Sequence, residues 1–445
     1  MSLLGELVGQ PAQKSKESKR VISVKKARRR SNNRRQSFVS LCTFLVFGIV
    51  GLQSVEVSEL YGRLLDTPLW ILPSLLIPAL FTVAGFVLSL RVQTFSPTIL
   101  ARQYSRRFLP PLVLATLISA FVIGPIVTSE TFLTYFSHPE VWLFLTNIIG
   151  WTHNYLPGVF EFNNAPGIVN EIFWIIPYLI FGFVVVLFSN KKRQWTTYWL
   201  ALTLTLLGIA ALVQIGLSLV DPRSFFQDAL AGKGLAALGC FLVGALASAS
   251  RRPVPVDWRL AVVTGLSVLA LAGVGHREFA ENGLFNLLLV PLLSYLVLYF
   301  SFTRLPFVRV SSALQPYLAG FLLFAYPVQQ FWIAVGPGQQ SPLLNLAMSV
   351  PIAAALAAVC WHLVQRRILG KDFELAFSGL SASDQSAQSA TAVGDLWRNR
   401  PTARAVVART ARLIPAILVG VALFLVSLGL LGMLFYALQR DTSGI

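Results

Sequence analysis

Long stretches of apolar residues alternate with short polar segments along most of this chain. An α-helix needs about 20 apolar residues to cross the hydrocarbon core of a bilayer, because every backbone group must find its hydrogen-bond partner inside the helix. The stretches that meet this condition are 38–55, 69–90, 108–127, 168–189, 195–220, 229–248, 260–275, 283–302, 313–335, 342–364 and 413–437. The pattern therefore predicts an all-α integral membrane protein with eleven spans.

The segments between these stretches divide the chain into four parts. Residues 1–37 form a polar, basic tail that we expect to be disordered, and 38–364 a core of ten spans joined mostly by short loops. Residues 365–412 are rich in Ser and Ala, which is typical of a flexible linker, and 413–437 form an additional span. The apolar run at 141–151 is too short to cross, so it is expected to be interfacial or re-entrant.

The positions of the basic residues predict the orientation of these spans. Cytoplasmic loops of membrane proteins collect Lys and Arg. If the N-terminus is cytoplasmic, 31 of the 36 basic residues fall on the cytoplasmic side, and only Arg63, Arg223, Arg277 and Arg440 face outwards. Counting 141–151 as a span would invert every later loop and remove this bias. The sequence therefore predicts a cytoplasmic N-terminus and an external C-terminus.

The amino-acid composition indicates which kinds of partner this chain is expected to bind. The chain is 55% hydrophobic and only 12% charged, so its net charge of +17 belongs mainly to the tail and the loops. The arginines at 28–30 and 34–35 stand directly before the first span, where they fix orientation and attract anionic lipid. We therefore expect no nucleic acid partner. Cys42, Cys240 and Cys360 each lie in a predicted span, with neither a disulfide framework nor metal-ligand spacing, so no metal site is expected.

Polar groups within or beside the spans are the candidate functional residues, because burying them in a membrane is costly. Once depth is assigned, they form two sets. The outer set is Asn170, Glu171, Gln329 and Gln330, and the inner set is Arg102, Arg106, Arg107, His362 and Gln365. Structural roles are the alternative: Asn170 as a helix cap, Glu171 at a helix N-terminus, and the arginines as orientation signals.

Several motifs resemble those of the acyltransferase 3 family of membrane proteins. The segments LPGVFEFNNAPG at 156–167 and NEIFWIIP at 170–177 resemble a stretch that in the family leads into Asn-Gly-Ser-Leu-Trp-Thr-Leu-Pro. FAYPVQQ at 324–330 is similar to the family's Tyr-Ala-Phe-Pro-Val-Gln-Gln, and CWHLVQ at 360–365 to its Ser-Trp-His-Leu-Ile-Glu. Two shorter motifs also match, AGF at 84–86 and RFLP at 107–110. Together they cover about 38–370 in the family's order.

The resemblance implies a ten-helix bundle that transfers an acyl group, often acetyl, from a cytoplasmic CoA donor to an exported or surface glycan or a lipid-linked sugar. Acyl-CoA (acetyl-CoA) is then a donor substrate rather than a tightly bound cofactor. Arg102, Arg106 and Arg107 are expected to bind its phosphates, for which the guanidinium fork is suited. The acceptor sugar is expected to contact Asn170, Trp174, Gln329 and Gln330.

The chain departs from the family at the residues that resemble a catalytic base. The family's His, eleven residues after an Arg, falls here on Leu45 or Val46, and Gln365 replaces the Glu of the tenth span. A hydroxyl acceptor needs a general base to become nucleophilic. Glu171 is the best substitute in this sequence, and His362 is the second.

Three functions remain open from the sequence, all in a multi-pass protein of the plasma (inner) membrane. The first is an O-acyltransferase with a relocated base, acting on a glycan or lipid-linked sugar. The second is a catalytically inactive relative that serves as a binding or assembly subunit beside polysaccharide synthesis proteins of the cell envelope. The third is a transporter, which only the number of spans supports, since no internal repeat is visible.

Overall fold

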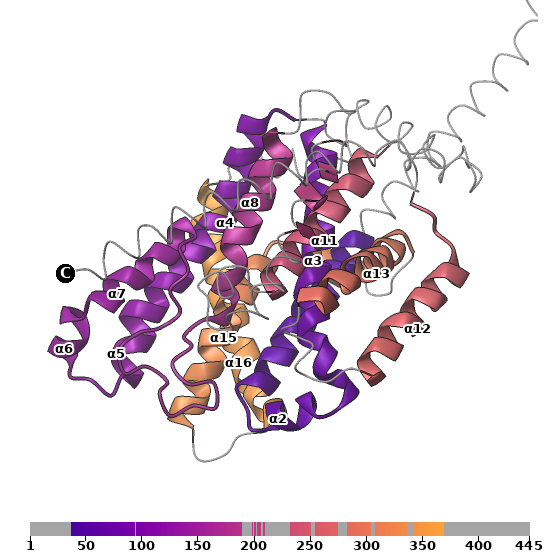
Figure 1. Ribbon diagram of the computed structural model, residues 1–445. Helices are drawn as coiled ribbons and strands as arrows, with labels where there is room; N and C mark the ends of the chain where they lie inside the picture. Colours follow the sequence, from indigo (N-terminus) through magenta and orange to yellow (C-terminus); the bar gives the residue numbers. More distant parts are fainter. Residues whose placement is uncertain are drawn as a thin grey trace, which may run out of the picture.

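The computed structural model describes residues 37–93, 95–188, 232–250, 254–274, 283–303, 308–336 and 341–368, together with a few residues between 198 and 209. Within these ranges the chain forms helices joined by turns and loops, and no β-strand occurs among them. The helices pack side by side (Figure 1). The tail at 1–37, the linker at 365–412 and the eleventh span at 413–437 lie almost entirely outside the described residues, as does most of 195–220.

Five helices in the described ranges are long and apolar enough to cross a membrane: Ser37–Glu56, Pro68–Val92, Pro97–Val127, Leu318–Val335 and Pro342–Ile368. Four further apolar helices pack with them, α8 (Ile175–Phe188), α11 (Gly232–Ala249), α12 (Trp258–Val274) and α13 (Gly283–Phe302). The chain is therefore an all-α membrane protein, as its hydropathy pattern predicts.

Three of the long helices are composite. Pro68–Val92 consists of the 3₁₀ turn η1 (Pro68–Ile71) and α3 (Leu72–Val92). Pro97–Val127 consists of α4 (Pro97–Ile118), the π-helical turn η2 (Ser119–Ile123) and α5 (Gly124–Val127). Pro342–Ile368 contains α16 (Pro342–Val359) and the π-helical turn η6 (Cys360–Gln365). Leu318–Val335 is α15.

The helix that contains α4 begins well before its apolar run. The sequence predicts a span from 108, whereas α4 begins at Pro97, after Ser96 in the extended conformation of an N-cap. Proline suits the first turn of a helix, and Arg and Gln are good helix formers, but hydropathy detects only the apolar part. Arg102, Arg106 and Arg107 therefore belong to the helix itself rather than to a loop before it.

The predicted span at 313–335 is divided. A short helix, α14 (Val308–Leu314), is followed by turns at 315–317, and α15 begins at Leu318. Pro316 lies in the interruption, where its missing N–H and its effect on the preceding residue disfavour a continuous helix. The division exposes the backbone carbonyl of Gln315 to side chains of neighbouring helices.

The short apolar run at 141–151 forms two short helices instead of a long one. They are α7 (Pro139–Leu143) and the 3₁₀ helix η3 (Phe144–Ile149), preceded by α6 (Phe132–Ser137). Gly150 ends the pair with a φ of 87°, a left-handed conformation that favours glycine. An irregular segment with several turns then runs from 151 to the N-terminus of the 3₁₀ helix η4 (Glu171–Trp174), which leads into α8.

Among the described residues, the most extensive contact between two helices joins α3 and α11, which lie against each other in the middle of the structure (Figure 1). Gly85 of α3 lies directly against the carbonyl oxygen of Phe241, and Gly244 of α11 lies against that of Thr82. A Cβ atom at either glycine would collide with the opposite backbone. Glycine allows helix backbones to approach closely in membranes, where packing replaces the hydrophobic effect as the driving force.

Candidate functional site

The polar residues predicted from the sequence gather in two places along α15. We call the "amide end" the set formed by Asn170, Glu171, Gln329 and Gln330, and the "arginine end" the set formed by Arg102, Arg106, Arg107 and His362. Tyr317 lies beside His362, whereas Asn170 bonds to the carbonyl of Leu323 and Glu171 lies near Tyr326, so the two levels are about 9 to 14 Å apart along α15 at 1.5 Å per residue. The structure therefore does not bring Glu171 and His362 to one place.

Gln330 holds the irregular segment before η4 against α15. Its Nε2 donates to the carbonyl oxygens of Ala165 (2.8 Å) and Ile168 (3.1 Å). Its Oε1 accepts from Nδ2 of Asn163 at 2.7 Å, and the same Nδ2 also reaches the Gln330 carbonyl at 2.9 Å. Gln330 is fully buried. Both halves of its amide are therefore used inside the protein.

Gln329 performs a similar role towards the first helix. Its Nε2 donates to the carbonyl of Val50 at 2.9 Å, and its own carbonyl accepts from Nδ2 of Asn345 at 3.1 Å. Ser54 completes the connection, since its hydroxyl lies 2.7 Å from the carbonyl of Pro342 and 3.3 Å from Oδ1 of Asn345. This network ties together the first helix, α15 and α16.

Asn170 fills a gap in the hydrogen bonding of α15. Pro327 has no N–H, so the carbonyl of Leu323, four residues earlier, loses its usual helical donor. Nδ2 of Asn170 donates to that carbonyl at 2.9 Å, while Oδ1 accepts from the N–H of Ile172 and caps η4. Asn170 is fully buried. Asn170 therefore forms the helix cap expected from the sequence. The same side chain also supplies the hydrogen-bond donor that Pro327 removes from α15.

Glu171 and Trp174 remain partly exposed beside this buried network. The carboxylates of Glu171 and Glu56 both act electrostatically on the phenol of Tyr326, which places the two acids near the same buried ring. Trp174 packs edge-on against Tyr178, with ring centroids 6.0 Å apart. Of the predicted residues at the amide end, these two are therefore the ones available to a ligand.

At the arginine end, too, a side chain donates a hydrogen bond to a carbonyl that a proline has left without its helical donor. Pro111 removes the helical donor of the Arg107 carbonyl, and Nε2 of Gln365 in η6 donates to that carbonyl at 2.6 Å. The guanidinium of Arg107 donates from Nη2 to the carbonyl of Gln315 at 3.2 Å. Gln365 and Arg107 therefore join α4 to η6 and to the turn before α15.

Arg102 and Arg106 are exposed on α4 and available to an anion. A further arginine, which the sequence analysis did not single out, lies nearby. Arg91 at the end of α3 is 7% exposed, and its guanidinium lies 6.0 Å from the ring centroid of Tyr104. It also lies close enough to Arg107 for the two charges to repel each other. Positive charge from two helices thus converges here.

His362 is exposed at the turn η6, which is π-helical. Its Nε2 lies 3.2 Å from the hydroxyl of Tyr317, and Trp361 packs edge-on against the same Tyr317 ring. A π-helical turn changes the direction of successive side chains and often occurs at functional sites. His362 therefore has a partner that orients its ring.

Leu45 and Val46 stand where the acyltransferase 3 family has its histidine, and both lie inside the apolar core. Leu45 and Val46 are 5% and 4% exposed and belong to the main hydrophobic cluster. The structure thus offers no polar group in place of a base at this point of the first helix. Gln53, two turns further along, is the nearest buried amide of that helix, and neither of its side-chain atoms has a hydrogen-bond partner within the described residues.

Gln53 and Asn345 are buried amides beside the amide end that sequence reasoning did not identify. Both lie in predicted spans, so the presence of an amide in an apolar run was the available signal. Oε1 of Gln329 also has no partner within the described residues. The amide end therefore retains hydrogen-bonding capacity that its own backbone does not use.

The described residues contain no group of three or more His, Cys, Asp or Glu side chains that could hold a metal ion. Comparisons with family models, with curated proteins and with solved structures find no match for this chain. Its fold defines the class, an α-helical membrane protein, and the two polar ends of α15 define the candidate site.

Proposed function

We propose that this protein is a membrane-bound O-acyltransferase of the plasma membrane that transfers an acyl group, most simply acetyl, from cytoplasmic acyl-CoA to an exported glycan or lipid-linked sugar. The observation that carries this proposal is the pair of polar clusters along α15. One presents guanidinium groups, and the other presents a carboxylate and an indole. An acyl donor with phosphates and an acceptor with hydroxyls need these two kinds of surface.

In this proposal the arginine end binds the donor. Arg102 and Arg106 are exposed, and Arg107 is fixed by the Gln315 carbonyl, so the three can contact phosphate oxygens from one helix. Arg91 adds a fourth guanidinium from α3. The same proposal includes a bundle of ten spans whose arginine end faces the cytoplasm. It also includes membership of the acyltransferase 3 family, which the motifs of the sequence resemble.

The amide end binds the acceptor, with Glu171 as general base and Trp174 as a stacking surface for a sugar ring. The carboxylate of Glu171 would take the proton of an acceptor hydroxyl, whose oxygen attacks the thioester carbonyl carbon. The C–S bond breaks, and the CoA thiolate leaves and is protonated. The pantetheine arm of the donor must cover the distance of about 9 to 14 Å along α15 for this reaction to occur.

The buried amides have an indirect role in this scheme. Asn170, Gln329 and Gln330 were expected to contact the sugar, but each is fully buried and bonded to backbone groups. We therefore assign them to positioning η4, with Glu171 and Trp174, against α15.

Turnover with purified protein tests the proposed base. Wild type, Glu171→Gln and His362→Gln are supplied with acetyl-CoA and candidate glycan lipids, and acetylated product is measured. We expect Glu171→Gln to reduce kcat by about 10² to 10⁴, the usual contribution of a general base, while His362→Gln retains activity. The reverse pattern would place the chemistry at the arginine end.

A second function is a catalytically inactive binding or assembly subunit for polysaccharide synthesis proteins. The burial of Leu45 and Val46 among apolar side chains, where the family has its His, favours it. Under this alternative wild type shows no turnover, and activity appears only when a base is restored, as in Val46→His. Activity in wild type that is lost in Glu171→Gln excludes it.

Donor binding is tested separately from turnover. Replacing Arg102, Arg106 and Arg107 with Gln should weaken acyl-CoA binding, whereas Arg63→Gln, an exposed arginine of α2 (Leu60–Leu65), should not. Lys at the same three positions should restore binding only in part, because Lys cannot form the bidentate contact with phosphate. Full restoration by Lys would mean that these residues supply charge alone.

A further inference from the structure

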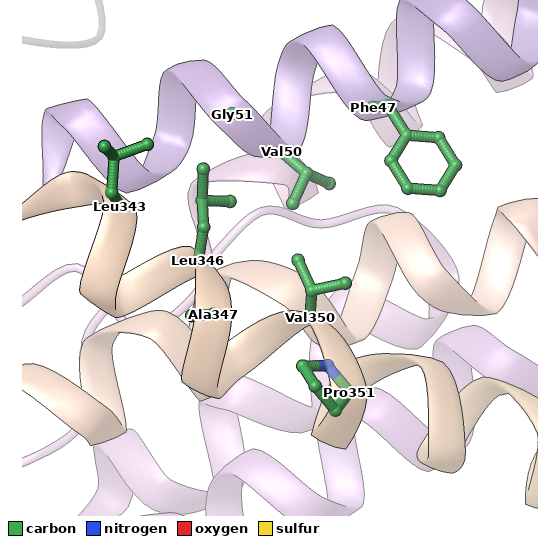
Figure 2. A pocket seen from close by; sticks show the side chains of 8 residues that line it. All are labelled: Phe47, Val50, Gly51, Leu343, Leu346, Ala347, Val350 and Pro351. Carbon is green, nitrogen blue, oxygen red and sulfur yellow. The ribbon is translucent and has the colours of Figure 1, made fainter.

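An apolar groove runs between the first helix and α16. Phe47, Val50 and Gly51 line one wall, and Leu343, Leu346, Ala347, Val350 and Pro351 line the other. Figure 2 shows the two helices with the side chains of Val50, Leu346 and Val350 between them. Its volume is about 410 Å³. The positions recur every three to four residues on each helix, so the groove follows one continuous face of both.

The helix that contains α16 is the least buried of the five membrane-length helices. Only 28% of the apolar window in Pro342–Ile368 is buried, compared with 44–61% for the other four membrane-length helices. Gly51 has open space around it, since a Cβ there would meet nothing within 4 Å, and Ala347 is exposed. Small residues on both walls permit a further helix to approach closely.

The groove also contains a gap in backbone hydrogen bonding. Pro351 removes the helical donor of the Ala347 carbonyl, and both residues line the groove. At Leu323 and Arg107 a side chain from another element donates to the carbonyl that a proline has left without its donor. Within the described residues no such donor from another element is found for Ala347. In a membrane such a carbonyl needs a partner from a neighbouring helix or from the protein itself.

We propose that the apolar segment 413–437 of this chain occupies the groove as a helix, with the hydroxyl of Ser427 donating to the carbonyl of Ala347. Ser427 is the only serine or threonine in the segment. The described chain ends at Ile368, which continues α16, so the segment is tethered to one wall of the groove by residues 369–412. A covalent tether keeps the segment at high effective concentration beside α16.

The direction in which segment 413–437 crosses the membrane is consistent with placing Ser427 beside Ala347. Ser54 near the end of the first helix bonds to Pro342 and Asn345 at the start of α16, so these two helices are antiparallel. The next span after α16 must also run antiparallel to it, and hence parallel to the first helix. Ser427 lies as far from Leu413 as Gly51 lies from Ser37, which brings Ser427 to the depth of the groove.

Cysteine cross-linking in the full-length chain tests the placement. Cys42, Cys240 and Cys360 are replaced by Ala, a protease site is inserted near residue 385, and Ala347→Cys or Gly51→Cys is paired with single cysteines at 427–430. Four successive positions sample every face of a helix. Oxidation followed by proteolysis should leave the two fragments joined for Ala347→Cys with Ser427→Cys. The control Leu269→Cys, exposed on α12, should give no cross-link.

The other occupants give different results. Joined fragments at the size of two chains would mean that the segment comes from a second copy, and this would overturn the proposal. Absence of cross-links at all four positions with both groove cysteines, together with labelling of Ala347→Cys by a lipid-soluble maleimide as fast as Leu269→Cys, would mean that lipid fills the groove.

A thermal test examines the hydrogen bond independently. Ser427→Ala should lower the Tm of the detergent-solubilised protein, and Pro351→Ala, which restores a backbone donor for the Ala347 carbonyl, should remove the effect of the serine substitution. Equal effects of Ser427→Ala in both backgrounds would contradict the proposed register.

Discussion

At the scale of single residues, prolines inside helices explain several of the buried polar contacts. Pro327 and Pro111 each leave a carbonyl four residues earlier without its helical donor, and Asn170 and Gln365 supply one. In the π-helical η2 the donor five residues after Ala120 would be Pro125, and the hydroxyl of Tyr135 donates to the Ala120 carbonyl at 2.8 Å instead. The polar side chains thus satisfy backbone groups that water cannot reach.

This account predicts that Gln365→Met will destabilise the protein through the Arg107 carbonyl. Methionine keeps the volume but has no donor, and leaving a buried carbonyl unsatisfied costs about 1–3 kcal/mol. The measurement is thermal unfolding in detergent. Pro111→Ala is the matched control, because it restores a backbone N–H to the same carbonyl.

In the double variant Gln365→Met/Pro111→Ala the loss should be smaller than in Gln365→Met alone, which a double-mutant cycle reports as coupling between the two sites. Independent, additive effects would show that the hydrogen bond contributes little to stability.

At the scale of elements, the crossing of α3 and α11 depends on two glycines whose hydrogens face the opposite backbone. Gly85 lies against Phe241 and Gly244 against Thr82, so each helix contributes one small residue to the other's surface. Because backbone atoms cannot move aside as a flexible side chain can, a larger residue must shift a whole helix.

We therefore expect Gly85→Ala to lower stability by about 1–3 kcal/mol, the usual cost of overpacking, and to reduce the yield of monodisperse protein. Gly265→Ala in α12 is the matched control, since a Cβ there meets nothing within 4 Å, and alanine is the better helix former. Thermal unfolding of both variants measures the difference. A similar Tm for the two would mean that α3 and α11 are less closely packed than described.

At the scale of the whole molecule, the proposed function requires the arginine end to face the cytoplasm, where acyl-CoA is found. The distribution of basic residues predicts this orientation, with the first 37 residues and the loop 365–412 inside and Ile445 outside. Fusion reporters at positions 20, 390 and 445 measure it. A cytoplasmic signal at position 445 would mean that the number of spans differs by one.

The identity of the candidate residues followed from the sequence, because amides, carboxylates and arginines stand out against apolar runs. The contacts of these residues did not follow from the sequence. Asn170 and Gln330 bond to carbonyls of segments that are far away in the chain, and Arg91 meets Tyr104 across two helices. Such pairings depend on the packing of the helices, which no local pattern specifies.

The sequence by itself determined that this chain is an all-α membrane protein. Backbone groups in hydrocarbon need hydrogen-bond partners within the helix, so each span is an apolar run long enough to cross the membrane as a helix. The sequence also indicated the ranges of most helices, with α13 at 283–302 as predicted. Only the tertiary structure decided that Asn170, Gln329 and Gln330 are buried partners of backbone groups, and that Glu171 and His362 lie at different levels of α15. Hydropathy records how much each residue prefers a membrane, whereas these contacts depend on which helices become neighbours.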